Sequence, residues 1–142
     1  MQNPRVTKWT LWALLVVCLG QMLYIYASSP GRPDPDRIVS VTPVGEGGAI
    51  YEVLYDSGGA TVPYVYRYFV MDLQASDEVA LKKTKKATPF LVTQSTGAVR
   101  EVAGTTVKLR TRETVYDFHN TAYFKTHGEL NIVTFDLDAT LP

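Results

Sequence analysis

The sequence has a single cysteine and no excess of charge of either sign. Cys18 lies inside a long apolar segment, so the rest of the chain has no second cysteine with which to form a disulfide. The residue before it is Val17, where a lipoprotein signal would carry a small residue, so we do not expect a lipid at Cys18. The 14 basic residues are matched by 14 acidic residues. Because a nucleic-acid-binding protein normally shows a basic excess, we expect no nucleic-acid partner.

The sequence also lacks a motif that would mark an enzyme. It contains no G-x-S-x-G nucleophile turn, and Gly58-Gly59 belongs to no phosphate-binding pattern. Asp136 and Asp138 alternate along a predicted edge strand, and acids at such positions usually discourage edge-to-edge aggregation. We therefore predict a protein that is not an enzyme and needs no cofactor.

Four residues toward the C-terminus are the best candidates for a metal site: Asp117, His119, His127 and Glu129. These residue types bind zinc, but the two histidines stand eight positions apart with no predicted helix or strand to bring them together. We therefore predict two loop histidines, or one at a strand end, and no metal.

The longest apolar run covers residues 9–27, which read WTLWALLVVCLGQMLYIYA and include no charged side chain. A helix of this length spans roughly 28 Å at ~1.5 Å per residue, close to the ~30 Å hydrocarbon core of a bilayer. Trp9 and Trp12 lie at one end, and Tyr24 and Tyr26 lie at the other. Aromatic residues at both ends are typical of the two membrane interfaces. The run is therefore predicted to be a transmembrane helix.

A cleaved signal peptide is the alternative for this segment. Arg5 and Lys8 form a short basic region before the apolar run, and residues 25–27 offer a cleavage site. The run is longer than the 7–15 apolar residues usual in a signal peptide. Length therefore favours a retained anchor.

The charges that flank the anchor predict its orientation. Arg5 and Lys8 stand close to the N-terminal end, whereas Arg32 and Arg37 stand further from the other end. Positively charged flanks favour the cytoplasmic side. We thus expect residues 1–8 to be a cytoplasmic tail, residues 28–36 (SSPGRPDPD) to be a proline-rich linker, and residues 37–142 to be an extracytoplasmic domain.

The domain reads as a series of short strands separated by turn signals. Residues 49–56 and 61–72 flank Ser57-Gly58-Gly59 and predict a β-hairpin. The range 76–86 is the one helix candidate, with Ser76 as its N-cap. The other predicted strands are residues 37–44, 89–94, 98–102, 105–112, 114–118 and 131–137. This spacing predicts a mainly β fold, either an antiparallel sandwich or a small, partly open barrel with one short helix.

Two groups of side chains are candidates for binding. Tyr64, Tyr66 and Tyr68 alternate along a predicted strand and share one face, which either packs in the core or forms a binding surface. The second group is a basic run: Lys82, Lys83, Lys85 and Lys86. This run is a solvated helix end, a site for an acidic protein, or a site for anionic lipid headgroups.

The organisation of the chain resembles that of small bacterial envelope proteins with a short cytoplasmic tail, one signal-anchor helix and a compact periplasmic domain. Immunity proteins, which neutralise a secreted toxin, are among these, and so are accessory subunits of envelope complexes. The resemblance implies a single-pass protein of the inner membrane that binds a protein partner, either a toxin or a complex subunit. In an accessory subunit, Gly20 and Gln21 would contact other transmembrane helices.

Overall fold

The computed structural model describes residues 4–28 and 33–140. The chain divides into two compact units between residues 32 and 33. Residues 1–3 of the predicted tail, residues 29–32 of the predicted linker and residues 141–142 lie outside the described residues.

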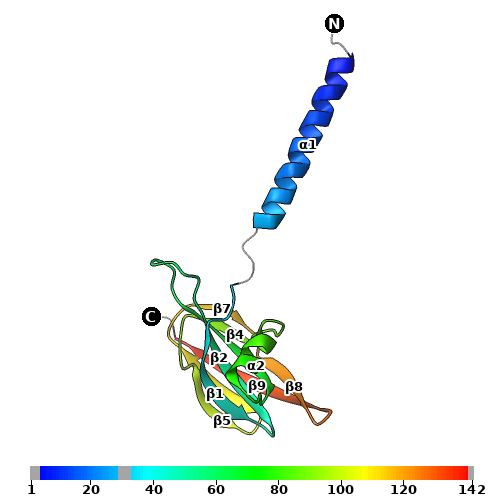
Figure 1. The fold of residues 1–142 in the computed structure, drawn as a ribbon. Coiled ribbons are helices and arrows are strands. Elements are labelled where there is room, and N and C mark those ends of the chain that lie inside the picture. Colours follow the sequence, from blue (N-terminus) through cyan, green and yellow to red (C-terminus); the bar gives the residue numbers. More distant parts are fainter. Residues whose placement is uncertain (1–3, 29–32, 141–142) are drawn as a thin grey trace. The chain divides into compact units, whose positions relative to one another are not determined.

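The first unit contains one helix, α1 (Pro4–Ser28), which includes the whole predicted segment 9–27 (Figure 1). Pro4 occupies the first position of the helix, where its missing N–H leaves no hydrogen bond unmade. Within the described ranges, α1 alone is long and apolar enough to cross a membrane, with a mean hydropathy of 1.8. A membrane anchor and a signal sequence both have this length and composition, so α1 fits either.

The second unit contains a five-stranded and a four-stranded sheet, here called sheet A and sheet B. Sheet A has the order β1-β2-β3-β4-β7, and every neighbouring pair is antiparallel. Its strands are β1 (Arg37–Val44), β2 (Gly48–Tyr55), β3 (Val65–Asp72), β4 (Leu91–Thr93) and β7 (Val115–Phe118). The predicted hairpin of residues 49–56 and 61–72 is confirmed as β2 and β3.

Sheet B has the order β5-β6-β9-β8. Its strands are β5 (Val99–Ala103), β6 (Thr106–Thr111), β8 (Thr121–Thr126) and β9 (Glu129–Ala139). β6 and β9 are parallel, so the expectation of a wholly antiparallel fold is wrong at this pair. The chain leaves sheet B after β6, adds β7 to sheet A and returns as β8, so β9 runs in the same direction as β6. Among the described strands the sheets do not close into a barrel.

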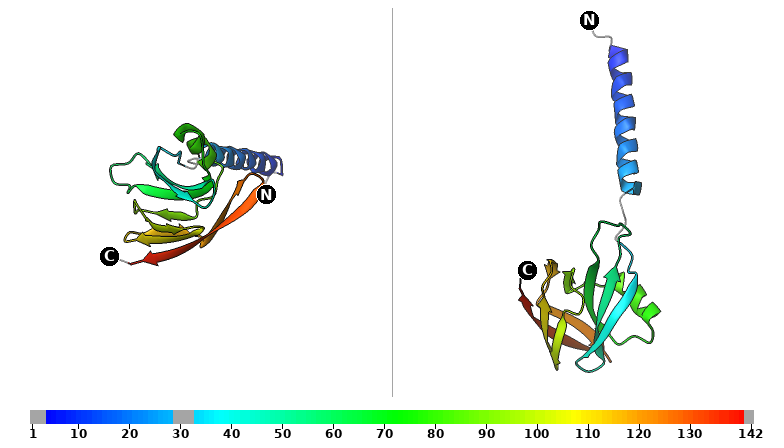
Figure 2. Two further views of the ribbon diagram at one scale, coloured as in Figure 1. Left: turned by 90° about the horizontal axis from the view of Figure 1, so that it is seen from below. Right: turned by 90° about the vertical axis from the view of Figure 1, so that its left-hand side faces the viewer.

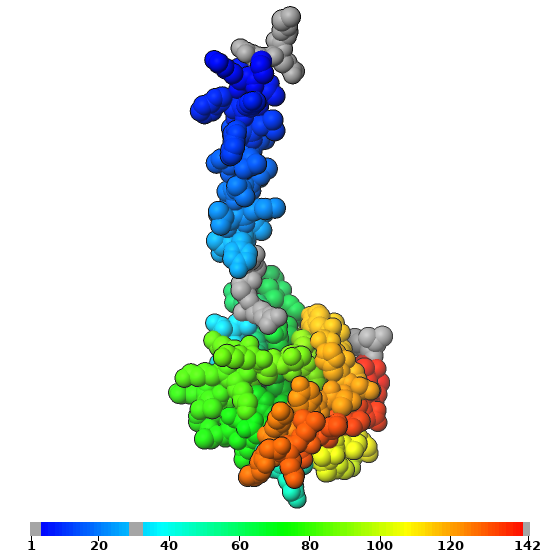
Figure 3. All heavy atoms as spheres, turned by 90° about the vertical axis from the view of Figure 1, so that its right-hand side faces the viewer, coloured from blue at the N-terminus to red at the C-terminus, as the bar shows by residue number. Residues whose placement is uncertain are grey.

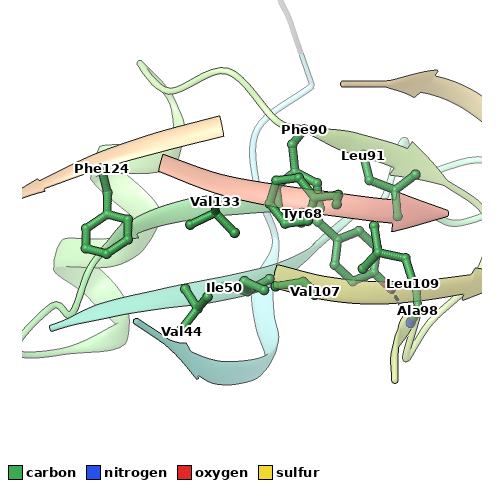
Figure 4. Packing of buried hydrophobic residues seen from close by; sticks show 11 residues of the cluster. Val44, Ile50, Tyr68, Phe90, Leu91, Ala98, Val107, Leu109, Phe124 and Val133 are labelled. Carbon is green, nitrogen blue, oxygen red and sulfur yellow. Dashed lines mark hydrogen bonds between the residues drawn. The ribbon is translucent and has the colours of Figure 1, made fainter. Parts of the chain in front are cut away.

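The main hydrophobic core lies between the two sheets, which form two layers in the left view of Figure 2. Ile50 and Tyr68 from sheet A meet Val107 and Val133 from sheet B (Figure 4). The neighbours of each of these residues along its strand point to the opposite face of the sheet, because side chains alternate between the two faces. The two sheets therefore pack as a sandwich.

Sheet A is buried on its other face as well. The helix α2 (Asp77–Thr84) covers that face, and Ala80 packs with Tyr51, Val53 and Phe69. For this reason all eight residues of β2 are buried, a pattern that strands covered on both faces show. The Ser76 side chain accepts a hydrogen bond from the Val79 amide, as the predicted N-cap requires, and the predicted helix is confirmed.

Two predicted boundaries are wrong. β3 begins at Val65 and not at residue 61, because the Gly59 carbonyl accepts a 3.1 Å hydrogen bond from the Val62 amide in a turn, and Pro63, which has no N–H, follows it. β9 begins at Glu129 and pairs with β8, a strand that the sequence analysis did not predict. β9 lies between β6 and β8, so its acids Asp136 and Asp138 are not on an edge strand.

Candidate binding surface

The three predicted tyrosines do not form one exposed row. Tyr64 lies in the loop before β3 and is 56% exposed, whereas Tyr66 is half-buried against the core between the sheets. Tyr68 has no exposed surface at all. Tyr66 and Tyr68 face sheet B, and burial increases along the strand from Tyr64 to Tyr68. Of the three rings, that of Tyr64 alone is exposed to solvent.

Tyr68 has a structural role that depends on its hydroxyl group. The hydroxyl donates a hydrogen bond of 2.8 Å to the Ser95 carbonyl. It also accepts one of 3.1 Å from the Ala98 amide (Figure 4). Burial, together with the nearby negative charge of Glu52, raises the pKa of Tyr68 far above its usual value. The phenol therefore stays neutral, and its two hydrogen bonds hold the segment between β4 and β5 against the core.

Glu52 fastens the same segment from the neighbouring strand. Its side chain is buried, and its carboxylate accepts hydrogen bonds from the Ser40 hydroxyl at 2.7 Å, the Thr96 hydroxyl at 2.6 Å and the Gly97 amide at 3.0 Å. A buried carboxylate is costly unless several donors satisfy it. Sequence reasoning overlooked Glu52, although an acidic residue between Tyr51 and Val53 in an otherwise apolar strand is a visible signal.

The four predicted lysines are all exposed but have different surroundings. Lys83 forms an ion pair with Asp72, and Lys85 lies 2.9 Å from the carboxylate of Asp34. Lys82 is on the exposed side of α2, and Lys86 follows the helix. The lysines therefore surround the C-terminal end of α2, where positive charge suits the helix dipole.

A groove lies beside this helix end, where the edges of the two sheets meet. It consists of two adjoining hollows of about 440 and 350 Å³, which share Val70, Ala87 and Tyr123. We call it the seam groove. Figure 3 shows the segment after α2, in green, directly beside the β8 segment, in orange.

The strand lengths explain why a groove forms at this place. β4 has only three residues and pairs with Tyr66, Arg67 and Tyr68 of β3. The second half of β3, from Phe69 onward, therefore has no strand of sheet A on that side. β8 is the edge strand of sheet B and packs against β3 there. The seam groove occupies the gap left by the short strand.

The seam groove combines an apolar floor with a basic rim. Val70, Phe90 and Phe124 contribute apolar surface, and Tyr123 is 68% exposed. Lys83, Lys86 and Lys125 lie at its borders. An exposed aromatic ring over apolar surface with charges around it is typical of a protein-binding site.

The structure separates the residues proposed for a metal site. Asp117 and His119 lie at the end of β7, 3.5 Å apart between Oδ2 and Nε2. His127 lies beyond the other end of β8, in the turn before β9, and Glu129 is the first residue of β9. Within residues 4–28 and 33–140 no three His, Cys, Asp or Glu side chains are grouped as metal ligands.

The aromatic residues proposed for the membrane interfaces all lie on α1. Trp9 and Trp12 are in its first half, Tyr24 and Tyr26 are in its last two turns, and all four are exposed. The helix thus carries aromatic side chains toward both ends of its apolar stretch, as an interface belt requires.

Comparison with known proteins identifies no relative. No protein-family model, no curated protein and no solved structure matches this chain significantly. The helix, the fold and the seam groove are therefore the features that bear on its function.

Proposed function

We propose that this chain is a non-enzymatic binding protein, anchored in the bacterial inner membrane by α1, whose β domain in the periplasm acts as an immunity protein and neutralises a secreted toxin. The observation that carries the proposal is the seam groove. It offers Tyr123 and an apolar floor at the junction of two sheets, on a domain joined to an apolar helix.

The seam groove suits a protein partner better than a small molecule. Its two hollows are shallow, and their lining mixes apolar side chains with lysines. Protein interfaces have such an apolar centre and a charged rim, and tyrosine is among the residues that contribute most to their affinity. The rim lysines Lys86 and Lys125 favour a partner with acidic groups around an apolar anchor.

An anchor gives an immunity protein a physical advantage. A binder confined to the membrane surface meets a toxin that must cross or attack that membrane at a raised effective concentration. The orientation expected from Arg5 and Lys8, with the N-terminus in the cytoplasm, would place the domain in the periplasm.

Site-specific photocrosslinking tests the binding surface. A photoreactive amino acid at Tyr123 in the full chain should capture a defined protein partner in cells. The same amino acid at Tyr116, which is 54% exposed on β7 outside the seam groove, serves as the matched control. Equal capture from both positions, or capture from Tyr116 alone, would contradict the seam groove as the binding surface.

A competition assay tests the immunity role itself. Deleting the gene should make cells sensitive to a sister strain or to the product of an adjacent toxin gene, and Tyr123→Ala should fail to restore protection. Tyr116→Ala should restore it. Unchanged survival of the deletion strain would count against immunity while leaving the crosslinking result intact.

A fusion of alkaline phosphatase to the C-terminus tests the orientation. The enzyme is active only after export, so the fusion should be active. An inactive phosphatase, together with an active cytoplasmic reporter at the same position, would place the domain in the cytoplasm and overturn that part of the proposal.

The second candidate function is that of an accessory subunit of an envelope complex. It is favoured by the small residue Gly20 beside the polar Gln21 on α1, because small and polar side chains are common where transmembrane helices pack. Crosslinks from Gln21 to a second membrane protein would support this role. Crosslinks confined to Tyr123 and a secreted protein would support immunity.

A further inference from the structure

The domain has a second concave surface, which shares no lining residue with the seam groove. Arg100, Arg110 and Arg112 line a hollow of about 260 Å³ together with Ser95, Thr96 and Glu113. The same three arginines border an adjoining hollow of about 510 Å³. We call the smaller one the arginine hollow.

The strand geometry brings the three arginines together. Arg110 lies on β6, and Arg112 lies in the bend directly after this strand; both side chains line the hollow. Arg100 lies on the neighbouring β5, at a register shift between Val99 and Glu101. A shift of this kind is a β-bulge, which re-aims the side chain of the extra residue. The arrangement therefore comes from the pairing of β5 with β6 and not from neighbouring positions in the sequence.

Among the described residues, two of the three arginines form no ion pair with the acids of this region. Asp138 accepts a 3.0 Å hydrogen bond from Nε of Arg110, and Glu101 binds Lys108 at 2.9 Å. In the part of the chain that the structure describes, no ion pair engages Arg100 or Arg112. Three arginines against Glu113 and the paired Asp138 leave the arginine hollow with a formal charge of +1.

The floor of the arginine hollow is held rigidly. The Ser95 hydroxyl accepts hydrogen bonds from the Arg112 amide at 3.4 Å and from the Glu113 amide at 3.2 Å. The Ser95 carbonyl and the Thr96 hydroxyl are in turn fixed by the buried side chains of Tyr68 and Glu52. Side chains that border a fixed backbone lose less entropy when a ligand binds.

We propose that the arginine hollow binds a phosphate-class oxyanion, carried either by free phosphate or by the headgroup of an anionic phospholipid. Guanidinium groups present paired N–H donors whose spacing matches two oxygens of a phosphate, and their charge persists at any physiological pH. A monoanionic phosphate or a phosphodiester headgroup balances the formal charge of the hollow. This site and the seam groove are independent, so either can exist without the other.

Binding is measured on the full chain in a neutral detergent, with the arginine Nε–Hε resonances followed by NMR. The probes are inorganic phosphate and a water-soluble short-chain phosphatidylglycerol, and a short-chain phosphatidylcholine is the zwitterionic comparison. Saturable shifts of arginine resonances with phosphate support a phosphate site. Shifts with phosphatidylglycerol that exceed those with phosphatidylcholine assign the phosphate to a lipid headgroup.

The decisive variant is Arg100→Gln/Arg112→Gln, which leaves the Arg110 ion pair with Asp138 intact. It should weaken binding of the probe by about tenfold or more, since each charged hydrogen bond is worth roughly that factor. Arg37→Gln, at the exposed start of β1, is the matched control and should leave the affinity unchanged.

A second variant separates charge from geometry. Arg112→Lys keeps the charge but loses the paired donors, so it should bind phosphate more weakly than the parent chain and more tightly than the double variant. The proposal is overturned if millimolar phosphate and phosphatidylglycerol leave the arginine resonances unchanged. It is also overturned if a folded double variant, with an unchanged amide spectrum elsewhere, binds the probes as the parent does.

Discussion

The carboxylate of Glu52 accepts a hydrogen bond of 2.6 Å from the hydroxyl of Thr96, which stands 44 positions later in the chain. This bond joins the middle of β2 to the segment that leads from sheet A into sheet B. The Gly97 amide donates to the same carboxylate oxygen at 3.0 Å. A buried carboxylate thus holds the segment by which the chain changes sheets, and Ser95 and Thr96 of that segment form the floor of the arginine hollow.

The first prediction concerns Glu52. Glu52→Ala should lower the free energy of unfolding by about 2–4 kcal/mol, because it leaves three hydrogen-bond donors without their acceptor inside the protein. Glu52→Gln should cost less, since an amide oxygen still accepts. Glu46→Ala, in the exposed turn before β2, is the control and should change stability by less than about 0.5 kcal/mol. Urea unfolding followed by circular dichroism measures all three, and equal values for Glu52→Ala and Glu46→Ala would contradict the bonding described.

The second prediction concerns the hydroxyl of Tyr68. Tyr68→Phe keeps the ring in the core but leaves the Ser95 carbonyl and the Ala98 amide unpaired, so it should destabilise the domain by about 1–3 kcal/mol. Tyr64→Phe, on a 56% exposed side chain, should have no measurable effect. Amide hydrogen exchange supplies a second readout: exchange at Ala98 should accelerate in Tyr68→Phe. Unchanged protection there would show that the hydroxyl does not hold this segment.

The third prediction concerns Gly48. A β-carbon at this position would overlap the ring of Phe124, which reaches across from β8. Gly48→Ala should therefore cost about 1–3 kcal/mol through overpacking. Phe124→Leu should also destabilise the domain by removing core volume, but the double variant should lose less than the sum of the two changes. Strict additivity in this double-mutant cycle would mean that the two residues do not meet.

The fourth prediction concerns the Asp72–Lys83 ion pair and pH. Burial raises the pKa of the Asp72 carboxyl, but hydrogen bonds with Lys83 and Gln74 outweigh it and leave the pKa below the usual value. A carboxyl with a lowered folded pKa stabilises the domain above its unfolded pKa of about 3.9 and stops doing so as pH falls through the folded pKa.

Asp72→Asn should accordingly be less stable than the parent chain at neutral pH, by no more than about 1 kcal/mol because both side chains are exposed. The difference should disappear in acid below the folded pKa and shrink in high salt. Lys83→Met should abolish the pH-dependent difference, whereas Lys82→Met should preserve it. A difference that persists in acid would show that Asp72 acts by some means other than its charge.

Much of the fold was predictable because it depends on local pattern. The period of two in residues 49–56 and 61–72, interrupted by Ser57-Gly58-Gly59, predicts the β2–β3 hairpin. Ser76 followed by two acids and later by lysines predicts α2. Both signals come from residues close together in the sequence, and no distant partner is needed to interpret them.

β8 and the seam groove were not predicted. The segment TAYFKT carries an alternating pattern, with Ala122 and Phe124 inward. It is short, however, and only two residues separate it from β7, so its pattern is hard to recognise as a separate strand. The groove depends on the shortness of β4 and on the meeting of β3 with β8, which are far apart in the chain. Tyr123 acquires its place in the groove from those contacts and not from its neighbours in sequence.

The sequence by itself determined the apolar helix, the mainly β character of the domain and the hairpin, since each follows from periodicity and turn residues within a few positions. The tertiary structure alone decided that β6 and β9 run parallel and that Tyr68 faces the core while Tyr123 faces solvent. The tertiary structure also brings Arg100 beside Arg110 and Arg112, which the sequence alone does not indicate. The reason is physical: local pattern specifies which side chains share a face, whereas the choice of the covered face depends on distant strands that bury it.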